Sequence, residues 1–327
     1  MVAGNSIKII DTVVCDAKLK AKHPELFHYT NRGGFEAIVR SNTLWATHFR
    51  HLNDDAEIST LKPLLLQAVA NVFDQEAKLR NRGTRNLYFY RGGGISHAKR
   101  FIASLYAATF DRTDAQFAVD AYTTSFSTHA GDTPHERENG LESQWRFYAT
   151  DGFCIVFDTN SLGELLGEEF DRLDYTHLNL EDVRYIADGA PLREYFDFIE
   201  PALHIAADQY FRGYQRQEMA TVEFLRCATL LKRGSFREER EVRVVAIPGA
   251  PGYQAQGAQE YPDLFVKKPI PAICEQPKRH ITLFEKANIT LPIKRVIVGP
   301  SEHQDENTQF ARTLFGCHVA LSKPRAS

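Results

Sequence analysis

The chain lacks the short motifs by which the commonest enzyme classes are recognised. It contains no P-loop, no GxGxxG after a predicted strand, no HExxH and no GxSxG. Each of these motifs supplies a defined piece of chemistry, such as phosphate binding, metal ligation or a nucleophile. Their absence argues against the usual nucleotide-binding, metalloprotease and hydrolase classes.

Cysteine is scarce and scattered. The five cysteines are an odd number, and none of them stands in a CxxC pair. Such a set argues against a disulfide framework and against a structural zinc site. We therefore expect no bound metal and a reducing, cytoplasmic location.

Long hydrophobic runs are also missing. No stretch approaches the roughly 20 apolar residues that a membrane-spanning helix needs, and the N-terminus lacks the apolar core of a signal peptide. We expect no membrane contact. The net charge of −3 is ordinary, so only local clusters of charge can indicate a partner.

The hydrophobic pattern of the 327 residues predicts strands and helices in irregular order. Residues 26–47 predict a strand, a helix and a strand. An irregular mixture favours an α+β fold over a doubly wound sheet. Further helices are predicted over 56–80, 96–110, 161–170, 192–231 and 303–315; strands over 121–128, 153–157, 180–187, 241–247, 294–298 and 317–321; loops over 129–140 and 248–262; and a turn or helix cap at Asn53–Asp55.

A basic segment, Lys78–Arg100, separates the first two long helices and contains no acidic residue. Its sequence predicts a loop in which aromatic rings alternate with cations. Such a loop suits phosphate contact and base stacking, although a solvated basic loop explains the composition equally well. The candidate nucleic-acid-binding residues are Arg80, Arg82, Arg85, Tyr88, Tyr90 and Arg91.

A second charged segment carries Glu239, Glu241 and Arg243 at alternate positions. Alternate residues of a strand point to the same face, so we expect the three side chains to lie together. Adjacent carboxylates repel unless a cation or a substrate hydroxyl offsets them. The segment is therefore either a solvated charged edge or a catalytic pair held in place by Arg243.

Three further segments carry candidate ligand-binding side chains. His28 ends a short strand and is followed by Tyr29 and Thr30; a lone histidine in such a place is more often structural than functional. The strand at Tyr122–Ser127 supplies hydroxyls that suit the middle of a nucleotide cleft. Tyr148 lies beside Trp145, where core packing is the default explanation and a cleft aromatic the alternative.

Eight short motifs follow one another along the chain. They are His28-Tyr29-Thr30, Leu44-Trp45, Asn53-Asp54, Ser125-Phe126-Ser127, Trp145 with Tyr148, Gly152-Phe153-Cys154-Ile155, Glu239-x-Glu241-x-Arg243 and Val296-Ile297-Val298-Gly299. In this order, the motifs resemble a large bacterial family known only as a domain of unknown function, over about residues 26–322. That family in turn is similar to the ADP-ribosyltransferase superfamily, with its His, Tyr or Ser, and Glu on three strands.

The resemblance implies an ADP-ribosyltransferase-like split β-sheet core in a single domain over 26–322. An N-terminal extension, 1–25, would precede it, and helical insertions would occupy about 56–118 and 190–232. NAD would be the substrate, with no metal. The implied catalytic residues are Glu241, Glu239 and His28; the implied NAD-binding residues are His28, Tyr29, Thr30, Tyr122, Ser125, Tyr148 and Arg243.

Within this scheme, His28 would contact the adenosine-side ribose, and Tyr122 or Ser125 would take the second role. Glu241 would bond the nicotinamide-ribose 2′-hydroxyl, and Glu239 would lie nearer the acceptor.

The expected activity is transfer of ADP-ribose to a macromolecule, with nucleic acid favoured over protein. The resemblance also suggests a toxin or antiphage effector restrained by an inhibitory or regulatory protein. Plain NAD hydrolysis and a nucleotide- or nucleic-acid-binding sensor without catalysis are the alternatives.

Overall fold

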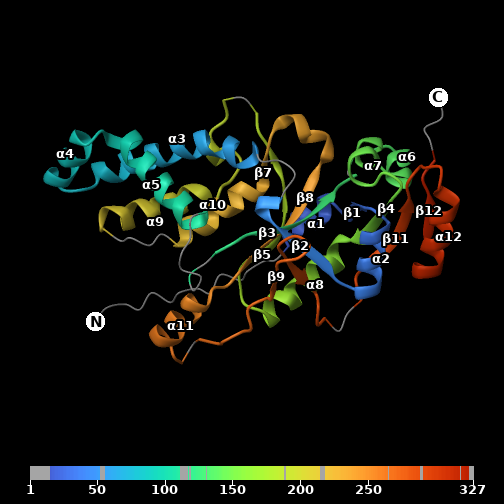
Figure 1. Cartoon of the computed structure of the whole chain (residues 1–327). Helices are drawn as coiled ribbons and strands as arrows, with labels where there is room; N and C mark the ends of the chain where they lie inside the picture. Colours follow the sequence, from blue (N-terminus) through green and yellow to red (C-terminus); the bar gives the residue numbers. More distant parts are fainter. Residues whose placement is uncertain are drawn as a thin grey trace.

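The computed structural model describes residues 15–51, 56–110, 117, 119–129, 131–187, 189–213, 218–263, 265–287, 290–316 and 318–323. A central, mostly antiparallel sheet is surrounded by helices, which confirms the predicted α+β class (Figure 1). No helix in these ranges is long and apolar enough to cross a membrane.

The sheet has ten strands and a branch. Its main path runs β12-β11-β4-β1-β3-β2-β10-β9, while β8 pairs with β3 and β5 pairs with β8. The strands are β1 (Glu25–Thr30), β2 (Leu44–His48), β3 (Tyr122–Ser127), β4 (Phe153–Asp158), β5 (Tyr175–Asp182), β8 (Glu241–Pro248), β9 (Ile273–Cys274), β10 (His280–Leu283), β11 (Ile293–Val298) and β12 (Val319–Leu321).

One face of the sheet is covered continuously. Side chains from alternate strand positions, such as Leu26, Tyr122 and Val242, pack there with Phe35 and Leu162 from two helices. Asn31 and Asp158 cap two of these helices by accepting a hydrogen bond from a backbone N–H of the first turn. Three of the helices on this face are α2 (Arg32–Ser41), α8 (Thr159–Arg172) and α12 (Gln304–Phe315).

The opposite face has two separate covers. The short helix α7 (Glu142–Tyr148) packs on β1 and β4 through a small core that includes Tyr29 and Trp145, and the preceding helix α6 (Pro134–Asn139) contacts β12. A larger helical layer covers the start of β3 and the end of β8, where it buries Val245 and Ile247. The sheet surface between the two covers is left for a pocket.

The helical layer is assembled from two distant parts of the chain (Figure 1). One part lies between β2 and β3, and the other follows β5; they share one hydrophobic core that includes Phe73, Phe101, Leu203 and Phe224. The first part is α3 (Ala56–Lys78), α4 (Arg82–Tyr90) and α5 (Gly93–Phe110), and the second is η3 (Leu192–Glu194), α9 (Ile199–Phe211) and α10 (Glu218–Leu230).

The sheet splits at β3. One edge of β3 pairs with β8 along its whole length, whereas the other edge is shared between two strands. β2 pairs with it at Tyr122 and Thr123, and β1 pairs with it at Ser127. Between these points β1 and β2 separate, which leaves the middle of that edge open to side chains.

Residues 15–24, the described part of the predicted N-terminal extension, pack against the sheet. They contain α1 (Ala17–Lys22), and both Cys15 and Leu19 are buried in the continuous core. Cys15 also forms a β-bridge with Leu180 of β5.

Three predicted loops contain helices. The basic segment forms α4 and the start of α5, because Asn81 caps a helix whose buried residue is Tyr88. Residues 129–140 contain α6, which begins with a capping box between Thr133 and Glu136. Residues 248–262 contain α11 (Pro251–Glu260), which Pro251 begins. The prediction for Asn53–Asp55 lies outside the described residues.

Candidate active site

A pocket of about 310 Å³ occupies the gap between the two covers. This volume is at the lower end of the range of small-molecule sites, roughly 300–1,000 Å³. Four strands supply its floor and one side, α7 supplies another side, and the segment around η4 (Gly234–Glu239) closes it. The lining residues are Phe27, His28, Tyr29, Trp45, Thr47, His51, Thr123, Thr124, Ser125, Phe126, Ser127, Gln144, Tyr148, Lys232, Phe236, Glu239, Glu241, Arg243 and Lys278.

The floor follows from the two-residue period of β3 and β8. On β8, Val245 and Ile247 lie under the helical layer, whereas Glu241 and Arg243 occupy the same face beyond its edge. The cross-strand partners of these charged residues on β3 are Ser127 and Ser125, which also line the pocket. On this face, the strand residues are thus apolar under the helical layer and polar beyond its edge.

The carboxylates lie in a network of charge. Glu241 Oε1 accepts a hydrogen bond from Arg243 Nε at 2.6 Å, and Oε2 accepts from the other arm of the guanidinium at 3.0 Å. Lys232 Nζ lies 3.1 Å from Glu241 Oε2 and 2.5 Å from Glu239 Oε2. Tyr148 donates to Glu239 Oε1 at 3.0 Å. Two cations therefore face two carboxylates at one end of the pocket.

Glu239 does not belong to the strand that carries Glu241, so the predicted three-residue strand face is wrong. Glu239 ends η4, and Arg240, at φ 45°, turns the chain before β8 begins. The two carboxylates come together because Lys232 lies between them. Arg240 contributes elsewhere, through an ion pair with the buried Asp132.

A small parallel sheet supports Glu241 from outside. It consists of β6 (Arg184–Tyr185) and β7 (Leu231–Lys232), in which Tyr185 is the direct partner of Lys232. Tyr185 accepts a hydrogen bond from the backbone N–H of Glu241 at 2.8 Å, while Lys232 reaches its carboxylate. The position of Glu241 is therefore fixed at both its backbone and its side chain.

Glu241 is ionised at neutral pH. Burial alone would raise its pKa, but the charges of Arg243 and Lys232, with hydrogen bonds from Arg243 and Ser125, lower that pKa to about 2. Burial and the neighbouring Glu239 carboxylate raise the pKa of Tyr148, so its hydroxyl keeps its proton and remains a donor.

His28 presents a defined tautomer to the pocket. Its Nδ1 lies 2.9 Å from the Ser125 carbonyl oxygen, which can only accept, so Nδ1 carries the proton. Burial lowers the pKa of His28, which leaves the ring neutral at pH 7 and makes Nε2 an acceptor. Such an atom suits a ligand hydroxyl and does not suit a phosphate or a carboxylate.

Two buried polar atoms of the lining have no hydrogen-bond partner among the described residues. They are Gln144 Nε2, whose residue is 4% exposed, and Thr123 Oγ1, whose residue is 3% exposed. A buried donor left unpaired costs about 1–3 kcal/mol, so both atoms favour a pocket that holds a polar ligand or water.

α7 sets one wall of the pocket. Gln144 and Tyr148 lie one turn apart and both line it, while Trp145 is buried and donates to the Asn139 carbonyl oxygen. A Cβ at Gly140, where φ is 82°, would lie 2.6 Å from the Trp145 indole nitrogen. Glycine therefore permits the close packing that fixes this helix.

The pocket brings together most of the residues predicted for NAD. His28, Tyr29, Ser125, Tyr148, Glu239, Glu241 and Arg243 all line it, although they come from distant segments. Thr30 and Tyr122 are outside it: Tyr122 points into the continuous core and is fully buried, so its predicted contact with a ligand is wrong. Ser125 is left as the candidate for the second role.

The α4–α5 tip (Lys78–Arg100) forms the far end of the helical layer (Figure 1). Two of the residues predicted there to bind nucleic acid are engaged within the protein. Arg80 pairs with Glu76 and Asp208, and Tyr88 is 3% exposed, with its hydroxyl donating to Asp74. Exposed apolar residues of the tip were not predicted; they are Leu79, Leu87, Phe89 and Ile95.

Several lining residues were not among the predicted site residues. Lys232 follows a helix and resembles any surface lysine; Phe236 and Trp45 resemble core residues. Lys232 could have been suspected only from the need for a cation beside two carboxylates. No group of metal-ligating side chains able to hold an ion occurs in the described part of the chain.

Comparison with known proteins adds one family. Residues 144–244 match the model of a family described as a protein of unknown function (DUF2971). The matched span runs from α7 to β8 and includes Tyr148, Lys232, Glu239, Glu241 and Arg243, but not His28 or Ser125. No curated protein matches the chain. No solved structure matches it either.

Proposed function

We propose that this protein cleaves the nicotinamide–ribose bond of NAD and transfers ADP-ribose to a macromolecule. One observation carries the proposal: His28, Ser125, Tyr148, Glu239 and Glu241, from four strands or helices and a 3-10 turn, line a single pocket. The split sheet at β3 is also what the resemblance to ADP-ribosyltransferases implies.

The chemistry of the step fits the pocket. The bond between ribose C1′ and the pyridinium nitrogen breaks, and its electron pair neutralises the departing nicotinamide. Positive charge develops on the ribose, and an ionised carboxylate such as Glu241 stabilises it. The acceptor oxygen then bonds to C1′ and loses its proton, which the more exposed Glu239 is placed to take.

His28 supports a sugar-containing ligand. Its Nε2 is an acceptor and therefore suits a ribose hydroxyl. Gln144 and Thr123 add hydrogen-bonding groups at other points of the lining. Acceptors and donors together favour a ligand that carries both hydroxyls and carbonyl oxygens.

Nucleic acid is the acceptor that we favour. Among the described residues, Arg82, Arg85 and Arg91 of the α4–α5 tip form no ion pair, and Tyr90 is 89% exposed. Free cations beside an exposed ring suit a single strand. A role as a toxin or antiphage effector, restrained by a partner protein, stays a prediction from the resemblance.

A nucleotide-binding role without catalysis is the second candidate. Glu241 already accepts hydrogen bonds from Arg243, Lys232 and Ser125, which leaves its oxygens little capacity for a ligand. A site that only binds NAD or a related nucleotide would tolerate this arrangement. The two candidates differ in whether nicotinamide is released.

The decisive experiment measures nicotinamide released from NAD by the wild type and by Glu241→Gln, alone and with RNA, DNA or protein. Loss of a preorganised group at the charged centre should lower the rate about 100- to 1,000-fold. Release that RNA or DNA stimulates would identify a nucleic-acid acceptor, and release without any acceptor would identify a glycohydrolase.

Glu25→Gln is the matched control. Glu25 also lies on a strand, pairs with Arg295 at 2.7 Å and 3.0 Å and with Lys294 at 2.9 Å, and these groups lower its pKa to about 2 against the effect of burial. It lies outside the pocket. Glu25→Gln should keep the wild-type rate. Equal loss in both variants, or no loss in Glu241→Gln, would contradict the proposal; NAD binding without release would favour the sensor.

A further inference from the structure

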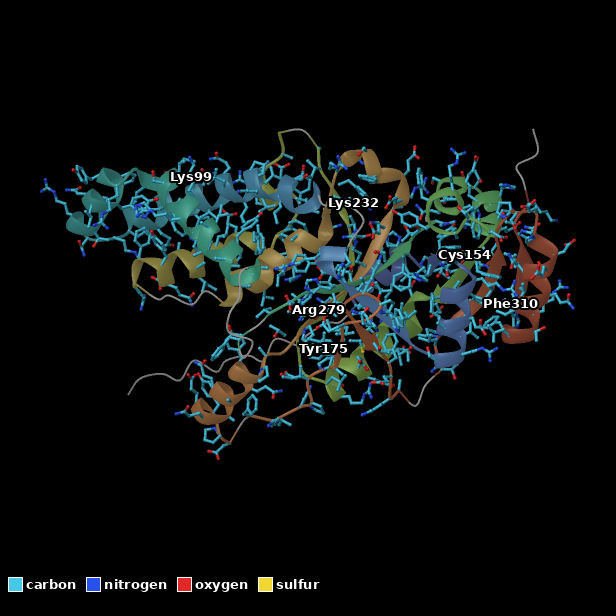
Figure 2. The ribbon with its side chains drawn as sticks, viewed as in Figure 1. Lys99, Cys154, Tyr175, Lys232, Arg279 and Phe310 are labelled. Carbon is cyan, nitrogen blue, oxygen red and sulfur yellow. The ribbon has the colours of Figure 1, made fainter. Side chains whose placement is uncertain are left out.

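Lys232 is the buried one of the two lysines that line the pocket, and it lies where the helical layer meets the sheet (Figure 2). Helix α10 ends at Leu230, and β7 follows directly with Leu231 and Lys232. Pairing with Tyr185 of β6 fixes the backbone of Lys232. Its residue exposure is only 5%, so its ammonium is largely withdrawn from water.

The ammonium of Lys232 is held between the two carboxylates. It lies 2.5 Å from Glu239 and 3.1 Å from Glu241, and its third side faces the Phe236 ring, whose centroid is 4.9 Å away. An ammonium has three protons to donate, and this arrangement uses two for carboxylates and turns the charge toward an aromatic face.

Other side chains surround the two carboxylates and Lys232. The Arg243 guanidinium bonds Glu241 and the Thr229 carbonyl oxygen of α10, and Tyr148 bonds Glu239 from the far side. The neutral Tyr185 hydroxyl bonds the backbone N–H of Glu241, the neutral His28 lines the same pocket, and the Arg233 guanidinium lies 5.2 Å from the centroid of the Phe236 ring. Lys232 is the group that bridges the carboxylates.

We propose that Lys232 is a positioning residue whose ammonium holds the carboxylates of Glu239 and Glu241 together in the pocket. This inference deepens the proposed function and rests on it for the activity alone. Without the ammonium, the two neighbouring carboxylates would repel each other, and this repulsion favours uptake of a proton by the pair. Glu239 would then lose its capacity to accept a proton from an incoming group.

The first test measures unfolding and needs no NAD. In Lys232→Met, the melting temperature should fall increasingly below that of the wild type as the pH rises from about 4 to 8. The sign follows from linkage: at low pH the variant carboxylates take up a proton, whereas at higher pH they must ionise without their cation. Wild-type Glu241, with its pKa at about 2, stays ionised throughout this window. Lys267→Met, at an exposed lysine outside the pocket, should show no such dependence.

A second variant keeps the test decisive if Lys232→Met does not fold at pH 7. Adding Glu239→Gln removes one of the two repelling charges, so the double variant should recover stability and should lose the pH dependence. The proposal would be overturned if the melting temperature of Lys232→Met fell by the same amount at every pH, or if the two substitutions showed no coupling. Lys232 would then contribute only packing.

The pH profile of nicotinamide release then tests the link to function. In Lys232→Met, the acid limb of kcat/KM should move up by at least one pH unit, and Lys232→Arg should restore it because it keeps the cation. An unmoved limb would overturn the positioning role. If the wild type releases no nicotinamide, the proposed function fails, while the unfolding tests still decide the role of Lys232.

Discussion

The pocket and the α4–α5 tip hold similar charged groups in opposite arrangements. In the pocket, the side chains of Lys232 and Arg243 are 6% and 3% exposed, and each is paired with a carboxylate. At the tip, Arg82 and Arg91 are exposed and form no ion pair with any described residue. Figure 2 shows how far Lys99 of the tip lies from Lys232.

The contrast indicates what each region can do. Buried, paired charges interact strongly because little water screens them, and folding fixes their positions before a ligand arrives. Exposed, unpaired charges are screened by salt over about 10 Å at 0.1 M and remain free to meet a polyanion. The pocket is thus suited to act on a bound group, and the tip to hold a large partner.

The largest expected difference between the two regions is in stability. Arg243→Gln leaves a buried carboxylate without its main partner and should lower the free energy of unfolding by about 3–5 kcal/mol. Arg82→Gln at the tip should change it by no more than about 0.5 kcal/mol. Urea unfolding of both variants measures this; equal changes would contradict the contrast.

The next expected effect is on binding of nucleic acid. Replacing Arg82, Arg85 and Arg91 together with glutamine should weaken binding of single-stranded RNA. The slope of log affinity against log salt should fall by about two, since each contact contributes about 0.7 for a single strand.

Arg80→Gln is the control for this triple variant, because its guanidinium is already paired with Glu76 and Asp208. RNA anisotropy at several salt concentrations gives both slopes. An unchanged slope in the triple variant would remove the tip from the acceptor site.

A smaller effect separates two tyrosines of the same helix. Tyr90→Ala should weaken RNA binding by about 1–3 kcal/mol, because the ring is exposed and free to stack. Tyr88→Phe should leave binding unchanged and lower stability by about 1 kcal/mol, because it loses the hydrogen bond to Asp74. The reverse pattern would show that α4 rearranges when it binds.

The smallest expected effect lies in the pocket wall. Tyr148→Phe removes the hydrogen bond to Glu239 and keeps the ring, so kcat/KM for nicotinamide release should fall roughly fivefold, about 1 kcal/mol. Phe147→Leu, at the neighbouring position that is 75% exposed, is the control and should behave like the wild type. A loss larger than that of Glu241→Gln would assign the tyrosine a direct part in the reaction.

The sequence was informative where local pattern decides structure. The β-branched and aromatic composition of β3 and the apolar run of β4 are visible in it, and so is the placement of Glu241 and Arg243 on one face of a strand. The helix α4 was missed because its aromatic and basic composition resembles a loop, while Asn81 and the buried Tyr88 make it helical in the folded protein.

The rest of the site depends on tertiary placement. Lys232 contacts Glu239 and Glu241 because β7 pairs with β6, and no periodic pattern in the sequence predicts this pairing. Likewise, Tyr122 and Ser125 lie three positions apart on β3 and therefore point to opposite faces, but only the tertiary structure decides which of these faces holds the pocket.

The shared core of the helical layer constrains how this chain can diversify. Its two parts enter the fold about a hundred residues apart, yet each buries its apolar face against the other. Exchanging one part alone between related chains would expose the other and leave Val245 and Ile247 uncovered. A graft must therefore move both parts together. It must also keep the segment from Thr229 to Lys232 in place, because there the helical layer contacts the charged floor of the pocket: Thr229 accepts a hydrogen bond from Arg243, and Lys232 donates one to Glu241.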